Sequence, residues 1–89
     1  MSGLNFTSIL WDRDDDPAGN VQHIAAHNLT KEDVEEVLES SVDTDISRSS
    51  GRPMAFGETP AGLYILVVYE EVDDSTVYPI TAYEVPRKS

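Results

Sequence analysis

The sequence contains no cysteine and few basic residues. The absence of cysteine among its 89 residues excludes disulfides and thiolate chemistry. Six lysine or arginine residues stand against seventeen aspartate or glutamate residues, which gives a formal net charge of −11 at pH 7. Because nucleic acids are bound mainly through clustered lysine and arginine, this charge disfavours RNA as a ligand. It fits either a need for solubility or attraction to a basic partner protein.

Long hydrophobic runs are also missing. No apolar segment approaches the roughly 18 residues that a membrane span requires, and the first six residues lack the basic and apolar regions of a signal peptide. We therefore expect a cytoplasmic protein that does not contact a membrane. Hydrophobic residues make up 39% of the chain and charged residues 26%, which is typical of a folded domain. A chain of this length has room for one small core, so we expect one domain over residues 1–89.

The N-terminal half predicts one strand and two helices. β-branched and aromatic residues predict a short strand over residues 6–11. A helix is expected from Pro17 to His27, because Asp16 is a good N-cap residue and proline suits the first helical position. A turn at residues 28–29 then separates this helix from the second one.

The second helix has the clearer start signals. Thr30 and Asp33 have the spacing of a capping box, and Leu29 and Val34 occupy the two positions of a hydrophobic staple. Apolar residues then recur at helical spacing, while the four intervening glutamates are expected to face water.

The C-terminal half predicts an antiparallel sheet. A short edge strand is expected over residues 42–46, followed by a mobile loop over residues 47–51. Pro79 removes a backbone donor, so we expect the last strand to lie at a sheet edge or to carry a bulge. Together the elements predict an α+β fold: a short N-terminal strand, two helices and then an antiparallel β-meander. The three longer strands, joined by short connections, are expected over residues 54–57, 63–70 and 76–84.

Within the strand expected over residues 63–70, the segment from Leu63 to Tyr69 is apolar on both faces. One face can rest on the two helices, but few residues are left to cover the other, and a bare apolar sheet face promotes association. We therefore predict that this second face, or a sheet edge, binds a second copy of the chain or a partner protein. The residues expected to contact that partner are Tyr64, Leu66, Val68 and Tyr78.

The motifs for metal ions are incomplete. His23 and His27 lie four residues apart and project from one face of the expected helix. No third ligand is marked, however, and Ile24 stands where the helix of a zinc hydrolase has glutamate. Two aspartate-rich segments, which begin at Asp12 and Asp43, lack the glycine and glutamate of an EF-hand loop. We expect no metal and no cofactor.

The basic residues are separated along the chain. Arg48 and Arg52 precede the meander, whereas Arg87 and Lys88 follow it. The first strand of a three-strand meander begins at the end opposite to that where the third strand finishes. We therefore do not expect these residues to converge into one positive patch.

Several motifs together resemble the BrnT-type toxins, a branch of the RelE-like toxin superfamily. The resemblance extends from Phe6 to Glu84 and depends on the set of motifs rather than on any one of them. The motifs are Trp11-Asp12, Asn20-Val21-x-His23-Ile24-Ala25-x-His27-x-Leu29-Thr30, Glu32-Asp33-Val34-Glu35-Glu36-Val37-Leu38, Arg52-Pro53-Met54-Ala55-Phe56-Gly57-Glu58-Thr59-x-x-Gly62 and Tyr78-Pro79-Ile80-Thr81-Ala82-Tyr83.

This resemblance implies a small α+β ribonuclease that is neutralised by an antitoxin carrying a DNA-binding segment. In such an enzyme, basic and acidic side chains on the sheet position an RNA 2′-hydroxyl for attack on its own phosphate and stabilise the developing charge. In this chain, His27, Arg52 and Tyr83 are the candidate catalytic residues.

Three positions depart from the family pattern. Tyr83 and Glu58 stand where active members usually have arginine, and the sequence ends at Ser89 without the usual basic tail. Loss of one preorganised donor costs roughly 10²- to 10³-fold in rate. We therefore expect a toxin-like protein with reduced or no nuclease activity and a partner-binding role. The alternatives are a working endoribonuclease, that is an mRNA-cleaving toxin, and an acidic interaction module that binds a basic protein.

Overall fold

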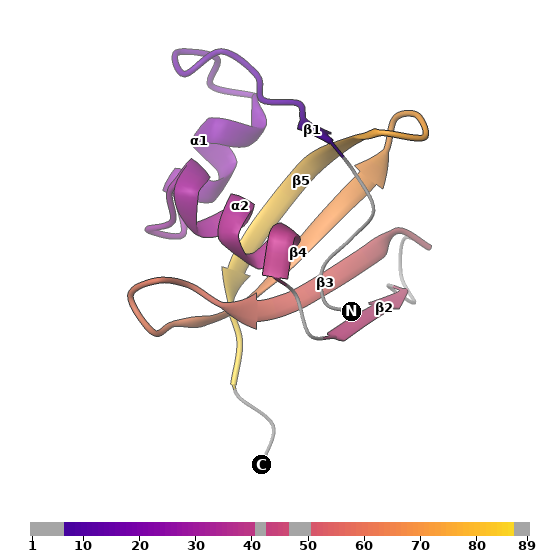
Figure 1. Ribbon diagram of the computed structural model, residues 1–89. Coiled ribbons are helices and arrows are strands. Elements are labelled where there is room, and N and C mark those ends of the chain that lie inside the picture. Colours follow the sequence, from indigo (N-terminus) through magenta and orange to yellow (C-terminus); the bar gives the residue numbers. More distant parts are fainter. Residues whose placement is uncertain (1–6, 41–42, 47–50, 87–89) are drawn as a thin grey trace.

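The computed structural model describes residues 7–40, 43–46 and 51–86, and this part of the chain contains two helices and five strands (Figure 1). Their order is the expected β-α-α-β-β-β-β, so the predicted α+β class is confirmed. The elements are β1 (Ser8–Ile9), α1 (Asn20–Ala25), α2 (Lys31–Ser40), β2 (Asp43–Ile46), β3 (Pro53–Glu58), β4 (Tyr64–Glu71) and β5 (Thr76–Glu84).

The strands form one mixed sheet in the order β1-β5-β4-β3-β2. Strands β2 to β5 are antiparallel neighbours, which confirms the meander. The short strand β1 instead pairs in parallel with β5, with Ser8 opposite Thr76 and Ile9 opposite Val77. Spacing along the sequence did not predict this pairing, because β1 and β5 lie at opposite ends of the chain.

Strand boundaries in the meander agree closely with the prediction. β5 has the predicted bounds, and the ends of β3 and β4 differ from the predicted ones by a single residue. β1 is much shorter than the expected strand over residues 6–11, because the chain after Leu10 turns away to bond with the start of α1. Residue 6, residue 42 and most of the expected mobile loop, residues 47–50, lie outside the described residues.

The start of α1 differs from the prediction. The helix begins at Asn20, with Gly19 as its N-cap, rather than at Pro17. Asp16 does use its side chain as a cap would, since its Oδ1 accepts a hydrogen bond from the amide of Ala18 at 3.0 Å. Its carbonyl, however, accepts from the amide of Gly19 at 3.0 Å, which closes a tight turn instead of a helical one. The predicted cap therefore belongs to a turn that precedes the helix.

The end of α1 is a Schellman motif centred on Asn28. Asn28 has a φ of 62°, the left-handed conformation that ends many helices. The amide of Leu29 donates to the carbonyl of Ile24 and the amide of Asn28 to that of Ala25, both at 3.0 Å. Leu29 and Ile24 are also buried in the same core, a hydrophobic pairing that frequently accompanies the motif. The predicted turn at residues 28–29 is thus confirmed, although the helix ends before His27.

The capping box at the start of α2 is confirmed. The amide of Asp33 donates to Thr30 Oγ1 at 3.2 Å, and the amide of Thr30 donates to Asp33 Oδ2 at 3.0 Å. These two bonds satisfy backbone donors that a helix start otherwise leaves unpaired. Leu29 and Val34, the expected staple residues, are both buried.

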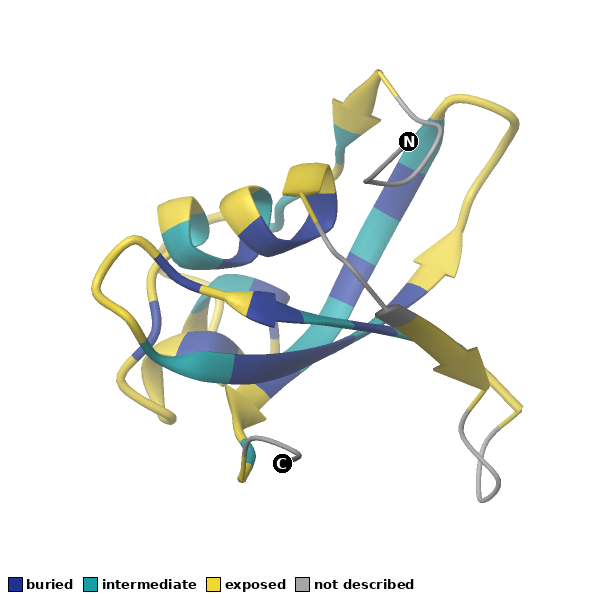
Figure 2. Cartoon of the chain, turned by 60° about the horizontal axis from the view of Figure 1, so that its bottom comes forward, coloured by how far each residue is buried: buried dark blue, intermediate teal, exposed yellow. Residues whose placement is uncertain are grey.

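Both helices pack on the same face of the sheet (Figure 1), with α1 against β5 and α2 against β3 and β4. Buried residues line the boundary between the helices and the sheet in Figure 2. A Cβ on Gly57 would lie 3.2 Å from Val37 Cγ1, so the absence of a side chain lets α2 approach β3 closely. The buried core consists of Ile24, Leu29, Val34, Val37, Leu38, Ala55, Ile65, Val67, Tyr69, Val77 and Ala82.

The predicted irregularity at Pro79 is confirmed as a bulge in β5. Val68 pairs with Thr81, but the next residue, Tyr69, pairs with Pro79, so Ile80 is the extra residue. The carbonyl of Pro79 lies beyond the two residues of β5 that pair with β1, and it accepts a hydrogen bond from Asn20 Nδ2 at 2.8 Å.

The face of the sheet opposite the helices is apolar and half-buried. Ile65 and Val67 belong to the core beneath the helices, so Leu66 between them points to the opposite face by strand alternation. Register places the other members of this row beside it: Phe56 opposite Leu66, and Met54 opposite Val68. We call the following five residues the far-face patch: Met54, Phe56, Tyr64, Leu66 and Val68.

Candidate functional site

A buried asparagine joins the edge of the sheet to α1. The side chain of Asn20 is 1% exposed, and its Nδ2 donates to the carbonyls of Leu10 at 3.1 Å and Pro79 at 2.8 Å. Its Oδ1 accepts from the amide of Asp12 at 2.9 Å, while Asp12 Oδ2 accepts from the amide of Asn20 at the same distance. Tyr78 completes the cluster, because its hydroxyl donates to Asp12 Oδ2 at 2.6 Å.

The bond between Tyr78 and Asp12 shifts the acidity of both groups. It is the main cause that raises the pKa of Tyr78 to about 12, with burial of the phenol and the charge of Asp12 as further causes. The same bond is the main cause of the lowered pKa of Asp12, and the backbone amide of Asn20 lowers this pKa further. The cluster is therefore most stable with Tyr78 protonated and Asp12 ionised.

We expect Tyr78→Phe to lower the free energy of unfolding by about 1 kcal/mol near neutral pH, the usual contribution of one hydrogen bond. The folded pKa of Tyr78 lies above its ordinary value of 10.0, so the stabilisation should be complete below pH 10 and disappear as the pH rises towards 12. The folded pKa of Asp12 lies below its ordinary value of 3.8, so stabilisation should also disappear as the pH falls below that value. Urea unfolding of both proteins across pH measures this difference.

Tyr83→Phe is the matched control for that experiment. The Tyr83 side chain is 38% exposed, and its hydroxyl makes no hydrogen bond within residues 7–40, 43–46 and 51–86. Its loss should change stability little at any pH. A difference between wild type and Tyr78→Phe that stayed constant from pH 6 to pH 12 would contradict the assigned bond.

Two of the three candidate catalytic residues lie together. The ring centroids of His27 and Tyr83 are 5.8 Å apart, with an interplanar angle of 47°. His27 follows the end of α1 and Tyr83 lies near the end of β5, so packing of α1 against β5 brings them into contact.

Arg52 lies away from this pair. Register places Tyr83 opposite Leu66, and Leu66 opposite Phe56. Arg52 precedes Phe56 by four residues, which is about 13 Å along an extended strand, and its strand is separated from that of Tyr83 by β4. Arg52, His27 and Tyr83 therefore do not converge on one point of the sheet.

The two histidines do not form a metal centre with neighbouring groups. Nδ1 of His23 lies 3.4 Å from the carbonyl of Ile80, beside the bulge of β5. Within the described ranges, no three histidine, cysteine, aspartate or glutamate side chains gather in a way that could hold a metal ion.

The far-face patch contains the apolar residues expected to contact a partner. Its aromatic pair, Phe56 and Tyr64, is stacked with ring centroids 6.4 Å apart and an interplanar angle of 21°. Leu66 is 7% exposed although it lies outside the core beneath the helices. Tyr64, Leu66 and Val68 thus form one surface, whereas the fourth expected contact, Tyr78, uses its hydroxyl within the chain.

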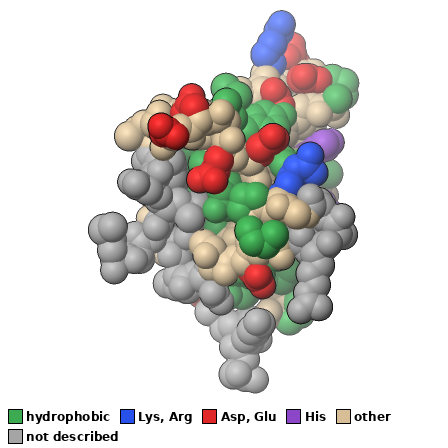
Figure 3. All heavy atoms as spheres, turned by 90° about the vertical axis from the view of Figure 1, so that its right-hand side faces the viewer, with side chains coloured by type: hydrophobic (Ala, Val, Ile, Leu, Met, Phe, Trp, Pro, Cys, Tyr) green, Lys and Arg blue, Asp and Glu red, His purple; other side chains and the backbone are tan. Residues whose placement is uncertain are grey.

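Acidic residues border the far-face patch. Glu58, at the end of β3, lies opposite Tyr64 of β4. Near the start of β3, Met54 lies opposite Asp45 of β2. In the view of Figure 3, hydrophobic side chains likewise lie beside acidic ones on the protein surface. A partner that covers the far-face patch would therefore meet negative charge at its margins.

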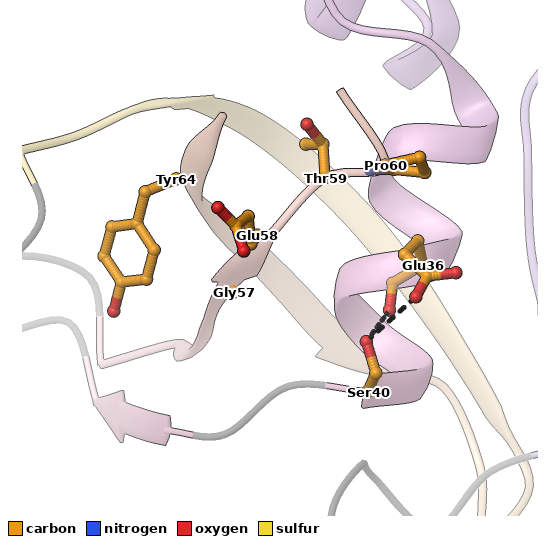
Figure 4. A pocket seen from close by; sticks show the side chains of 7 residues that line it. All are labelled: Glu36, Ser40, Gly57, Glu58, Thr59, Pro60 and Tyr64. Atoms are coloured by element: carbon orange, nitrogen blue, oxygen red, sulfur yellow. Dashed lines mark hydrogen bonds between the residues drawn. The ribbon is translucent and has the colours of Figure 1, made fainter. Parts of the chain in front are cut away.

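A pocket of about 530 Å³ adjoins this surface at the end of α2. Figure 4 shows Tyr64 and Glu58 on its strand side and Glu36 and Ser40 on α2. The pocket was not predicted from the sequence, because its two carboxylates come from segments far apart in the chain. The residues that line it are Glu36, Ser40, Gly57, Glu58, Thr59, Pro60 and Tyr64.

No role of its own was predicted for Asn20, although the residue opens one of the motifs on which the resemblance to BrnT-type toxins depends. The structural role of Asn20 depends on its hydrogen bonds to the carbonyls of Leu10 and Pro79. Spacing along the sequence does not indicate that these two carbonyls lie close together.

Comparisons with known proteins add no relative for this chain. No family model, curated protein or solved structure matches it. The longest helix in the described residues, α2, has ten residues, and none of these helices is long and apolar enough to cross a membrane.

Proposed function

We propose that this chain is a toxin-like protein of the RelE-like superfamily, BrnT branch, whose function is to bind a basic partner protein rather than to cleave RNA. The observation that carries the proposal is the far-face patch, an apolar surface opposite the helices in a strongly acidic chain. Apolar surface patches that are rimmed by polar residues commonly mark protein interaction sites, and four of the five patch residues are partly accessible while Leu66 is buried.

Charge favours a basic partner over a second copy of the chain. Each copy carries a formal net charge of −11, so two copies would repel each other as they approached. A basic protein would instead be attracted and oriented by the acidic residues at the margins of the patch. An antitoxin with a basic DNA-binding segment has this chemistry.

The placement of the candidate catalytic residues supports a weak or absent nuclease. Cleavage of RNA requires groups that are positioned together around the reacting phosphate. Arg52 lies at the opposite end of the sheet from Tyr83 and two strands away. The contact between His27 and Tyr83 favours the alternative, an active endoribonuclease, because an imidazole and a phenol could transfer protons.

We expect the purified protein to produce no fragments from a long RNA, and to bind an eight-residue peptide of alternating leucine and arginine through the far-face patch. Amide NMR signals of Leu66 and Val68 should shift during titration with this peptide. Val68→Thr, which keeps the shape of a half-buried side chain, should weaken binding by several fold. Leu10→Ala is the control, since Leu10 is 48% exposed and lies outside the patch.

Each alternative has a distinct outcome. RNA fragments that disappear in Arg52→Ala and His27→Ala would establish the endoribonuclease instead. If Val68→Thr weakened peptide binding no more than Leu10→Ala did, the far-face patch would not be the binding surface. Sedimentation that showed a dimer of the free protein would assign the patch to a second copy.

A further inference from the structure

We propose that the far-face patch binds an amphipathic α-helix of the basic partner, with apolar side chains on the patch and arginine or lysine along the flanks of the helix. The inference rests on the proposed function and names the element that the partner presents. Three features of the protein carry it: the backbone pairing of the strands beneath the patch, the width of the apolar surface and the charges beside it.

The strands beneath the centre of the patch are paired on both sides. Met54 and Phe56 of β3 have partners on β2 and on β4. Leu66 and Val68 of β4 have partners on β3 and on β5. The amides and carbonyls of such strands point along the plane of the sheet towards the neighbouring strands. This part of the sheet therefore meets a ligand with side chains alone.

A helix suits such a surface better than an extended segment does. An extended segment that lies flat on the patch would bury its own backbone donors and acceptors without partners, which is unfavourable. A helix bonds these groups to one another along its own backbone. The patch therefore favours a partner whose covering segment is helical.

The sequence of β4 is typical of a strand that is covered on both faces. The segment from Leu63 to Tyr69 is apolar at every position, as in strands that have helices on both sides of their sheet. In the described residues, α1 and α2 both lie on one face of the sheet (Figure 1). A partner helix on the other face would complete three layers of helix, sheet and helix.

The apolar surface extends from the patch onto β5. Register places Tyr83 opposite Leu66 and Thr81 opposite Val68. Tyr83 faces away from the core, because its neighbour Ala82 is buried in the core, and Tyr83 is 38% exposed. The surface thus covers three adjacent strands, about 10 Å from β3 to β5 at the usual strand spacing. This width matches the diameter of a helix with its side chains.

Negative charge lies beside one end of this surface. Asp45 of β2 pairs with Met54, so it lies next to the patch. Glu70 follows Val68 by two residues on β4, so alternation places it on the same face. Both carboxylate residues are exposed, and arginine or lysine on the flank of a bound helix would meet them at the rim, where charge orients association. The same charges would repel a second copy of the chain.

The test compares two peptides of about sixteen residues, long enough to form a helix in water, with identical contents of leucine, alanine and arginine. In the helical order, leucine recurs every three or four residues and gives a helix one apolar face. In the alternating order, leucine stands at every second position and gives a strand one apolar face. Both peptides have the same net charge and the same intrinsic helix propensity, so a difference in affinity reports the arrangement that the protein selects.

We expect the helical order to bind about tenfold more tightly in isothermal titration, since one buried backbone group without a partner costs about this much affinity. Its helical circular dichroism should increase on binding. Val68→Thr should weaken its binding by several fold, whereas Leu10→Ala should not, because Leu10 lies outside the patch.

The rim charges are tested by Asp45→Asn/Glu70→Gln, which should weaken binding of the helical order by about twofold for each carboxylate. The matched control is Glu32→Gln/Glu39→Gln, which removes two exposed carboxylates of α2, on the opposite face of the sheet. If this control weakened binding as much as the rim variant did, net charge would account for the attraction and the assigned contact of the helix flanks would be wrong.

Equal or tighter binding of the alternating order would overturn the helical partner while leaving the proposed partner-binding function intact. The inference would also fail if Val68→Thr bound the helical order as tightly as the wild type does, because the peptide would then lie elsewhere. Failure of both peptides to bind would overturn both proposals.

Discussion

Asn20→Ala should lower the free energy of unfolding by about 3 kcal/mol, a large part of the roughly 5 to 15 kcal/mol that stabilises a typical domain. The reason is that alanine removes three side-chain hydrogen bonds in a site where Asn20 is 1% exposed. The amide of Asp12 and the carbonyls of Leu10 and Pro79 would each lose a partner. Buried polar groups without partners cost about 1 to 3 kcal/mol each.

Thermal and urea unfolding followed by circular dichroism measure this effect. For a domain of this size, a loss of 3 kcal/mol corresponds to a fall of about 15 °C in Tm. Gln22→Ala is the control, because Gln22 is an exposed amide side chain on the same helix, and it should change stability by less than about 0.5 kcal/mol. Equal effects of the two substitutions would show that Asn20 does not link α1 to the sheet.

Leu38→Ala should destabilise the protein by about 3 kcal/mol, within the range of 2 to 5 kcal/mol that is usual for leucine in a core. Leu38 is 0% exposed and belongs to the core between the helices and the sheet. The substitution removes buried apolar surface and leaves a cavity beneath α2. Close packing of Val37 on Gly57 limits how far α2 can move towards the sheet to fill the cavity.

Urea unfolding also measures the destabilisation expected for Leu38→Ala, and Leu10→Ala is the control. The control makes the same chemical change at a side chain that is 48% exposed, so it should shift the midpoint only slightly. Hydrogen exchange should show faster opening of α2 in Leu38→Ala. A loss below about 1 kcal/mol would mean that α2 contributes little to the core.

Local sequence signals predicted the helix ends best where the donor and the acceptor of each capping hydrogen bond lie within a few residues of each other. The capping box of Thr30 and Asp33 and the turn at Asn28 depend on neighbouring backbone groups, so sequence spacing was sufficient. The start of α1 was wrong because Asp16 caps a turn, and the helix begins only at Asn20. Bonds from Asn20 to Leu10 and Pro79 outweigh that local preference.

Part of the far-face patch could be predicted from the sequence, and part could not. The segment from Leu63 to Tyr69 is apolar at every position and must therefore have an apolar outer face, so Leu66 and Val68 were predictable from alternation. Their neighbour Phe56 and the border residue Glu58 were not assigned to this surface, since strand register depends on pairing. The pocket was hidden for the same reason, because Glu36 and Glu58 meet only when α2 packs on β3.

The kinds of element, the acidic character of the surface and the presence of a second apolar sheet face could all be predicted from sequence alone. These properties follow from composition and from periodicity within single segments. Only the tertiary structure decided that β1 pairs in parallel with β5, that Asn20 starts α1, and that an acidic pocket adjoins the apolar face. Each depends on contacts between distant segments, such as the bond between Asn20 and Pro79, which are 59 residues apart.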